Sequence, residues 1–255
     1  MSSSSTWDFA GDPEGRFPAI ARLEVAEVPF ARPTVVPYVT TWSKEQPALF
    51  SQLKIRADGF GLAWENERPT ERDTHGVLWA RVDGERRGVP CFGAADPLRQ
   101  RKVMEQMLCQ VCAGPSSRTS KGYLFLNPAP DEAPGASWGE EDLTSEGPVC
   151  LPCAGLAVEQ CRALRRQGAV ALRARKVARF GVYGTLFQPD RSGRLVQVTD
   201  DIHFAYSDPA SAWLVAVKLL VELRRCTVVD LTAELSQSGA SGSARAPRTT
   251  RLTTP

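Results

Sequence analysis

The N-terminal third of the chain alternates apolar and polar residues in short runs, a pattern that indicates half-buried β-strands. From Ile20 to Phe92, β-branched and aromatic residues alternate with polar ones, and turn residues recur at short intervals. The pattern predicts an antiparallel β-rich region over residues 18–95. Its clearest elements are an alternating strand at Ala21–Val28, a turn at Asp58-Gly59, and a hairpin that joins Gly76–Val82 to Val89–Phe92 through Asp83-Gly84.

Two helices are expected in the middle of the chain. Asp96-Pro97 predicts the start of the first, because aspartate caps a helix and proline suits the first helical position. This helix runs to Leu108, and the second begins at Cys153 and ends at Gly168. Between them we expect a strand at Gly122–Leu126 and an acidic loop over residues 127–148, which is rich in proline and glycine.

The C-terminal part returns to a β pattern at Ala169–Phe187, with a hairpin turn at Arg191-Ser192-Gly193. The apolar run that follows Asp208-Pro209 continues through Arg225 and is apolar around most of a helical circumference, which predicts a central helix. A short strand is expected at Thr227–Val229.

Together these elements predict an α+β fold in which the C-terminal hairpin, helix and strand pack back on the β-rich part. The predicted organisation is a disordered N-terminus at 1–17, the β-rich region at 18–95, a central cysteine module at 96–168, the hairpin, helix and strand at 169–235, and a disordered tail at 236–255.

The composition is that of an ordinary globular protein and excludes few classes of function. The chain has 255 residues, 42% of them hydrophobic, and a formal net charge of +2. So small a net charge argues against a whole surface devoted to nucleic acid. The longest apolar stretch is shorter than the ~20 residues that a membrane span requires, and the serine-rich start has no signal-peptide pattern. We therefore expect a cytoplasmic protein that does not enter membranes.

Four of the seven cysteines stand in two Cys-x-x-Cys pairs, Cys109/Cys112 and Cys150/Cys153. Two such pairs supply four thiolates in a tetrahedron, and the metal that suits this donor set is Zn²⁺. Four sulfur ligands leave no open coordination position, so the expected zinc is structural. Buried unliganded thiols and a redox dithiol are the alternatives. The other cysteines, Cys91, Cys161 and Cys226, are expected to be buried thiols.

The order of helix, first cysteine pair, strand, loop and second pair at the mouth of a helix resembles the treble-clef zinc finger. Leu108–Cys112 in particular is similar to the first knuckle of HNH-type endonucleases. That resemblance implies a nuclease with a histidine base near the knuckles, but no histidine lies between Cys112 and Cys150, and the only two are His75 and His203. The longer chain also resembles a family of uncharacterised actinobacterial proteins, which implies a shared architecture without an activity.

Basic residues flank both cysteine pairs and form the candidate surface for nucleic acid or a protein partner. If the zinc fold gathers them, they make a patch that contacts phosphates, unless the acidic loop covers it or it is simply a solvated face. We therefore expect a non-catalytic adaptor or regulator, with a divergent HNH-like metal-dependent nuclease as the alternative. The candidate residues are Arg99, Arg101, Lys102, Arg118, Lys121, Arg162, Arg165, Arg166, Arg173 and Arg175.

Overall fold

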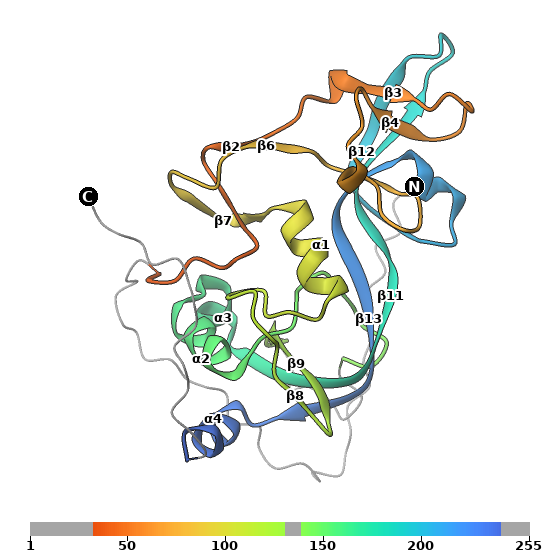
Figure 1. The fold of residues 1–255 in the computed structure, drawn as a ribbon. Helices are drawn as coiled ribbons and strands as arrows, with labels where there is room; N and C mark the ends of the chain where they lie inside the picture. Colours follow the sequence, from red (N-terminus) through yellow and green to blue (C-terminus); the bar gives the residue numbers. More distant parts are fainter. Residues whose placement is uncertain (1–32, 131–138, 241–255) are drawn as a thin grey trace.

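The computed structural model describes residues 33–130 and 139–240, and Figure 1 shows how their elements are arranged. The expected strand at 21–28, the N-terminus at 1–17 and most of the predicted C-terminal tail lie outside these residues. Residues 236–240, which we assigned to that tail, belong to a helix.

Two long antiparallel strands organise the molecule. β11 (Ala169–Pro189) pairs with β13 (Leu214–Val229) along most of its length, and Figure 1 shows them side by side as one curved ribbon. Along its other edge, β11 pairs first with β9 (Gly122–Pro128) and then with β12 (Leu195–Ala205). The β11–β12 turn contains Gly193 at φ +81°, which confirms the predicted hairpin.

The remaining strands are short. β8 (Arg118–Thr119) pairs with β9, while β10 (Leu143–Thr144) and β5 (Leu78–Trp79) pair with β13, β5 in parallel. In the described part of the N-terminal region, from residue 33 on, the structure has three separate two-stranded pairs. They are β1 (Thr40–Trp42) with β7 (Pro90–Ala95), β2 (Glu45–Pro47) with β6 (Val82–Gly84), and β3 (Leu53–Ile55) with β4 (Leu62–Trp64).

Helices pack against the sheet formed by β9, β11 and β13. They are α1 (Pro97–Glu105), α2 (Leu151–Gln160), α3 (Arg162–Gln167) and α4 (Leu231–Ala240), with single 3₁₀ turns η1 (Phe50–Gln52), η2 (Pro69–Glu71) and η3 (Pro209–Trp213). The chain is therefore an α+β protein, as predicted. No helix within the described ranges is long and apolar enough to cross a membrane.

The start of α1 confirms the prediction from its capping sequence. The Asp96 carboxylate accepts the backbone N–H of Arg99 at 2.8 Å, and Pro97 occupies the first helical position. The buried side chain of Gln100 then joins α1 to β13, because it accepts from the Leu219 N–H at 2.9 Å and donates to the Leu219 carbonyl at 3.1 Å.

The predicted helix from Pro209 through Arg225 is wrong. Only Pro209–Trp213 is helical, as one 3₁₀ segment, and Leu214 begins β13. Leu214 and Ala216 pack in one core, whereas Val215 between them packs in another, so both faces of this strand are covered. A strand buried on both faces is apolar throughout and shows no alternation, which is why it resembled a buried helix.

The predicted hairpin at Asp83-Gly84 is also wrong, since β6 pairs with β2 and β7 pairs with β1. Gly84 does have a positive φ of +100°, but for a different reason. A Cβ at this position would lie 2.2 Å from the carbonyl oxygen of Lys44, so glycine is required by the close approach of the neighbouring strand. The turn at Asp58-Gly59, in contrast, joins β3 to β4 as predicted.

Among the residues that the structure describes, three groups of buried side chains form the interior. The first core lies between α1 and the β11–β13 ribbon and includes Trp79, Met104, Phe125 and Leu219. The second core surrounds Cys109 and Cys153 and includes residues of α2, β9 and α4. The third core contains Leu62, Trp64, Leu78, Ala80, Phe187 and Val215. Trp42, Trp64 and Trp79 are also buried, and their large rings anchor this interior.

Candidate metal centre

The first cysteine pair lies in a tight turn after α1. The backbone N–H of Cys109 donates to the Gly114 carbonyl at 2.8 Å, and the N–H of Ala113 donates back to the Cys109 carbonyl at 2.8 Å. Met107 and Ala113 have positive φ angles of 50° and 57°, which reverse the chain on both sides of the pair. Cys109 and Cys112 are therefore held on one side of a closed loop.

The second pair lies at the start of α2. Cys150 is the N-cap residue, and its carbonyl accepts the first helical bond, from the N–H of Ala154 at 2.9 Å. Cys153 follows in the first turn, where the positive end of the helix dipole favours a thiolate. The segment just before Cys150 is fixed on β9, because the Val149 N–H donates to the Leu124 carbonyl at 2.9 Å.

Gln110, inside the first Cys-x-x-Cys, connects the two pairs directly. Its backbone N–H donates to the Pro148 carbonyl at 3.0 Å, and its side-chain oxygen accepts the N–H of Gly147 at 2.9 Å. This role of Gln110 was not predicted from the sequence, where a polar residue between two cysteines is the only sign of it.

The turn and the helix bring the four sulfur atoms together. All four Sγ atoms lie within 4.8 Å of one another, and those of Cys112 and Cys150 are 3.9 Å apart. A tetrahedral Zn²⁺ with Zn–S bonds of about 2.3 Å requires neighbouring sulfurs about 3.8 Å apart. The spacing of the thiols therefore fits one metal ion, and these four residues could hold it.

Burial separates the site from water on one side. Cys109 and Cys153 are fully buried, whereas Cys112 and Cys150 are half-buried. Around them lie Val111, Leu124 and Val149 of the second core, so the cysteines are part of its packing. A metal bound here would join the knuckle, α2 and β9 around one point.

The four thiols shift one another's pKa values. The pKa of the Cys112 thiol is well below its usual range, because the thiol of Cys109 and then those of Cys150 and Cys153 hydrogen-bond to its thiolate. The pKa of the Cys153 thiol is raised, since it is a hydrogen-bond partner of Cys109, Cys112 and Cys150. Four thiolates cannot coexist at such distances without a cation between them.

Both histidines lie away from the elements that carry the cysteines. His75 stacks on Tyr206 with ring centroids 3.8 Å apart, and His203 is exposed on β12. Within the described ranges, the four cysteines are the one group of three or more metal-ligating residues found. The arrangement gives no support for an HNH-type catalytic site.

Two of the ten candidate basic residues are engaged in the interior and are not surface groups. Arg99 binds the Glu45 carboxylate through both Nη atoms and has a side chain only 14% exposed. Arg173 is fully buried and binds Glu234 on α4, with an Nη2–Oε2 distance of 2.6 Å. The sequence could not separate these structural arginines from surface ones, because their partners are 54 and 61 residues away.

Arg101 is also mostly covered. Its guanidinium lies 4.9 Å from the ring centroid of Trp79 and donates to the Thr70 carbonyl at 2.8 Å. Lys102 beside it is exposed on α1. The six remaining candidate residues lie near the two ends of β9.

At the N-terminal end of β9, an exposed basic corner is formed by Arg118, Lys121 and Arg175. Arg118 stacks over Tyr123 at 5.0 Å, and Arg175 donates to the Ser120 carbonyl at 3.0 Å, so three strands meet here. At the other end of β9, α3 carries Arg162, Arg165 and Arg166. The seven residues of β9, at about 3.3 Å each, separate the two basic groups by roughly 20 Å. The two groups therefore form two separate surfaces.

The described part of the acidic loop lies on β13 and not on either basic group. Glu140 accepts the N–H groups of Arg225 and Cys226 at 2.9 Å each, and the Glu141 N–H donates to the Leu223 carbonyl at 2.8 Å. Asp131 and Glu132 lie outside the described residues. The expected covering of a basic patch by this loop is therefore not seen in residues 139–148.

The three remaining cysteines are less buried than we predicted. Cys91 and Cys161 are exposed and Cys226 is half-buried. Cys161 lies at the break between α2 and α3 with ψ +121°, an extended conformation that removes it from the helical apolar face. Burial raises the pKa of the Cys226 thiol to about 12.

Comparisons with protein-family models, with curated proteins and with solved structures give no significant match for this chain.

Proposed function

We propose that Cys109, Cys112, Cys150 and Cys153 bind one structural Zn²⁺ in a treble-clef-like module. Four thiols with near-tetrahedral spacing support this proposal, because soft sulfur donors in that geometry select zinc. The order of knuckle, β8–β9 hairpin and helix α2 is also that of a treble clef. Four thiolates fill the coordination shell and leave no position for substrate or catalytic water.

The zinc would serve to fix the helices around the sheet. It would tie the turn that follows α1 to the first turn of α2, across strand β9. In this role the ion sets the angle between α1 and α2 and the position of the β8–β9 hairpin. We infer a non-catalytic cytoplasmic protein that acts as an adaptor or regulator by binding a partner.

The partner surface we propose is the exposed basic corner of Arg118, Lys121 and Arg175. This corner suits an anionic partner, either nucleic acid or an acidic protein face. Three cations and the Tyr123 ring lie close together there, on β8, β9, β11 and the β8–β9 turn. Tyr123 is partly buried, and a guanidinium stacked over an aromatic ring of this kind suits a phosphate backbone with an adjacent base. Nucleic acid is therefore the partner to test first.

Fluorescence anisotropy with labelled duplex and single-stranded oligonucleotides at several salt concentrations tests this function. Each phosphate contact contributes about 0.7–0.9 to the slope of log affinity against log salt. The triple variant Arg118→Gln, Lys121→Gln and Arg175→Gln should lower that slope by about 2–3 and weaken binding. A variant with Arg87→Gln, Arg191→Gln and Arg194→Gln removes the same charge from exposed positions elsewhere and should bind as wild type.

A chain that shows no binding to either oligonucleotide at low salt would contradict the nucleic-acid partner. Capture of a protein partner that the first triple variant loses and the control variant retains would then assign the same corner to protein binding. Equal binding by both variants would refute the proposed surface.

A further inference from the structure

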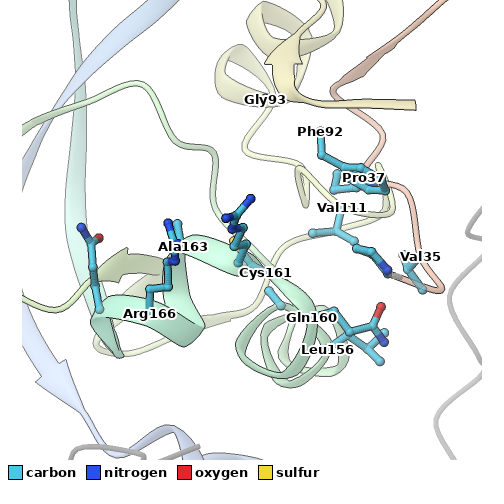
Figure 2. A pocket seen from close by; sticks show the side chains of 14 residues that line it. Val35, Pro37, Phe92, Gly93, Val111, Leu156, Gln160, Cys161, Ala163 and Arg166 are labelled. Atoms are coloured by element: carbon cyan, nitrogen blue, oxygen red, sulfur yellow. The ribbon is translucent and has the colours of Figure 1, made fainter. Parts of the chain in front are cut away.

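A groove of about 790 Å³ lies between helices α2 and α3 on one side and two extended segments, residues 33–37 and 92–93, on the other. Figure 2 shows Phe92 and Pro37 on one side of this hollow, Leu156 and Gln160 on the opposite side, and Val111 between them. Most of its surface is apolar. This size and this lining are typical of sites for small organic ligands, which occupy about 300–1,000 Å³.

Hydrogen bonds hold the two walls of the groove in place. The backbone N–H of Thr34 donates to the Gln160 side-chain oxygen at 2.9 Å, and the Gln160 amide donates to the Thr34 hydroxyl at 3.0 Å. The Tyr38 N–H donates to the Val111 carbonyl at 2.9 Å, which fixes the same segment on the cysteine knuckle. Hydrogen bonds therefore join residues 34–38 both to the end of α2 and to the cysteine knuckle.

The bulge in β7 contributes to one wall. In the pairing of β1 with β7, the register moves from Ala95 to Cys91 over a single step of the partner strand, so the residues between them bulge outward. Phe92 belongs to this bulge, lines the groove and is 47% exposed. Bulges commonly redirect a side chain in this way next to binding sites.

The charged residues that line the groove, among those the structure describes, have one sign. Arg162 and Arg166 lie four residues apart on α3 and both are exposed, and no acidic side chain of residues 33–130 or 139–240 lines the groove. Among the described residues neither arginine has an ion-pair partner. Arg166 is seen in Figure 2 on the α3 side, next to Ala163. Guanidinium groups bind carboxylates through paired hydrogen bonds.

We propose that this groove binds a small amphipathic carboxylate, with the apolar chain between Val35, Phe92, Val111 and Leu156 and the carboxylate on Arg162 and Arg166. The apolar wall would supply most of the affinity, and the two arginines would select an anion over a neutral or cationic molecule. This proposal does not depend on the partner of the basic corner, which lies at the other end of β9.

Isothermal titration of the full-length, metal-loaded chain with decanoate tests the proposal. Decan-1-ol, decylammonium and inorganic phosphate are the comparison ligands. We expect saturable binding of one decanoate per chain, at least about tenfold tighter than any of the three others, because only decanoate combines the chain with the anion. Saturating decanoate should also slow alkylation of the exposed Cys161 thiol, which lines the groove, and leave Cys91 unaffected.

Two variants assign the binding to the groove. Arg162→Gln with Arg166→Gln should weaken decanoate binding about tenfold or more, whereas Arg191→Gln with Arg194→Gln removes equal charge from exposed positions elsewhere and should leave it unchanged. Ala163→Glu puts an acidic side chain on an exposed helical position of the groove, where folding tolerates it, and should abolish binding.

Several results would overturn the proposal. They are no decanoate binding, equal binding of decan-1-ol or of phosphate alone, and decanoate affinity unchanged in both groove variants. Circular dichroism of each variant confirms that the protein compared is folded.

Discussion

The guanidinium of Arg173, near the start of β11, is completely buried and binds the carboxylate of Glu234 on α4, with distances of 2.6 Å from Nη2 to Oε2 and 2.8 Å from Nε to Oε1. Arg173 also donates to the Gly122 carbonyl and the Ser117 hydroxyl at 3.0 Å each. One arginine thus joins the sheet, the β8–β9 hairpin and the last helix.

Removal of the Glu234 charge should therefore be costly. Glu234→Gln leaves the buried guanidinium without its counter-charge, so we expect a loss of about 3 kcal/mol in the free energy of unfolding, measured by urea denaturation. Glu85→Gln breaks the exposed pair with Arg87 and should cost less than about 1 kcal/mol. Equal effects of the two changes would show that the Arg173–Glu234 pair is not a structural contact.

The buried pair of Glu71 with Arg81 predicts a dependence of stability on pH. Burial acts to raise the pKa of Glu71, but hydrogen bonds from Arg81 and from the Arg68 N–H outweigh it, so the pKa lies below its ordinary value of 4.5. A depressed pKa stabilises the fold above the unfolded pKa, and this contribution disappears as the pH falls through the folded pKa.

Thermal unfolding of wild type and Glu71→Gln between pH 3 and 7 measures this contribution. We expect the variant to be less stable at neutral pH and the difference to shrink as the pH falls below about 4.5. Glu85→Gln, at an exposed position, should differ from wild type by an almost constant amount. A Glu71→Gln difference that does not change with pH would argue against an ionised, paired carboxylate.

A single methyl group added at Gly122 should have a large effect on the stability of the fold. Its φ is +112°, and a Cβ would lie 2.0 Å from the carbonyl oxygen of Ala174 on β11. Gly122→Ala should destabilise the protein by roughly 2–4 kcal/mol, because both the backbone angle and the strand pairing resist it. Gly59→Ala, with φ +77° and no atom within 4 Å, carries only the angular strain and should cost about 1 kcal/mol in the same unfolding assay.

A near-wild-type Gly122→Ala would mean that β9 does not approach β11 as described. The comparison with Gly59→Ala then separates the strain of the angle from the contact between strands.

Metal removal should loosen the second core before the others. The cysteines are part of that core, whereas the first and third cores depend on the β11–β13 ribbon and the tryptophans. After chelation we expect faster hydrogen exchange in α2 and residues 109–117 and little change in β5 and residues 214–221. Uniformly faster exchange would show that the metal site stabilises the whole chain, and unchanged exchange would show that it stabilises nothing.

The sequence predicted best those elements that depend on local chemistry. Asp96 and Pro97 predicted the start of α1 correctly, since they are its N-cap and its first residue. Gly168, at φ +81°, follows α3 as expected of a residue that ends a helix. The cysteine spacing predicted that four thiols would meet, because Cys-x-x-Cys turns and a helix start need few other contacts to be recognised.

Features that depend on distant partners were not predictable. The run from Leu214 reads as a helix until β11 and β5 are known to lie on both of its edges. Arg99 and Arg173 read as surface cations until Glu45 and Glu234 are placed beside them. The groove beside α3 combines segments about 120 residues apart, and no local pattern indicates it.

X-ray absorption at the zinc edge of the purified protein tests the central claim most directly, since it reports both the ion and its ligands. We predict one Zn²⁺ per chain with four sulfur neighbours at about 2.3 Å. In Cys112→Ser, or in a chain with Cys150→Ser, the four-sulfur shell should be lost, whereas Cys161→Ser should retain it. A wild-type protein without zinc, or with nitrogen or oxygen ligands in place of sulfur, would contradict the account.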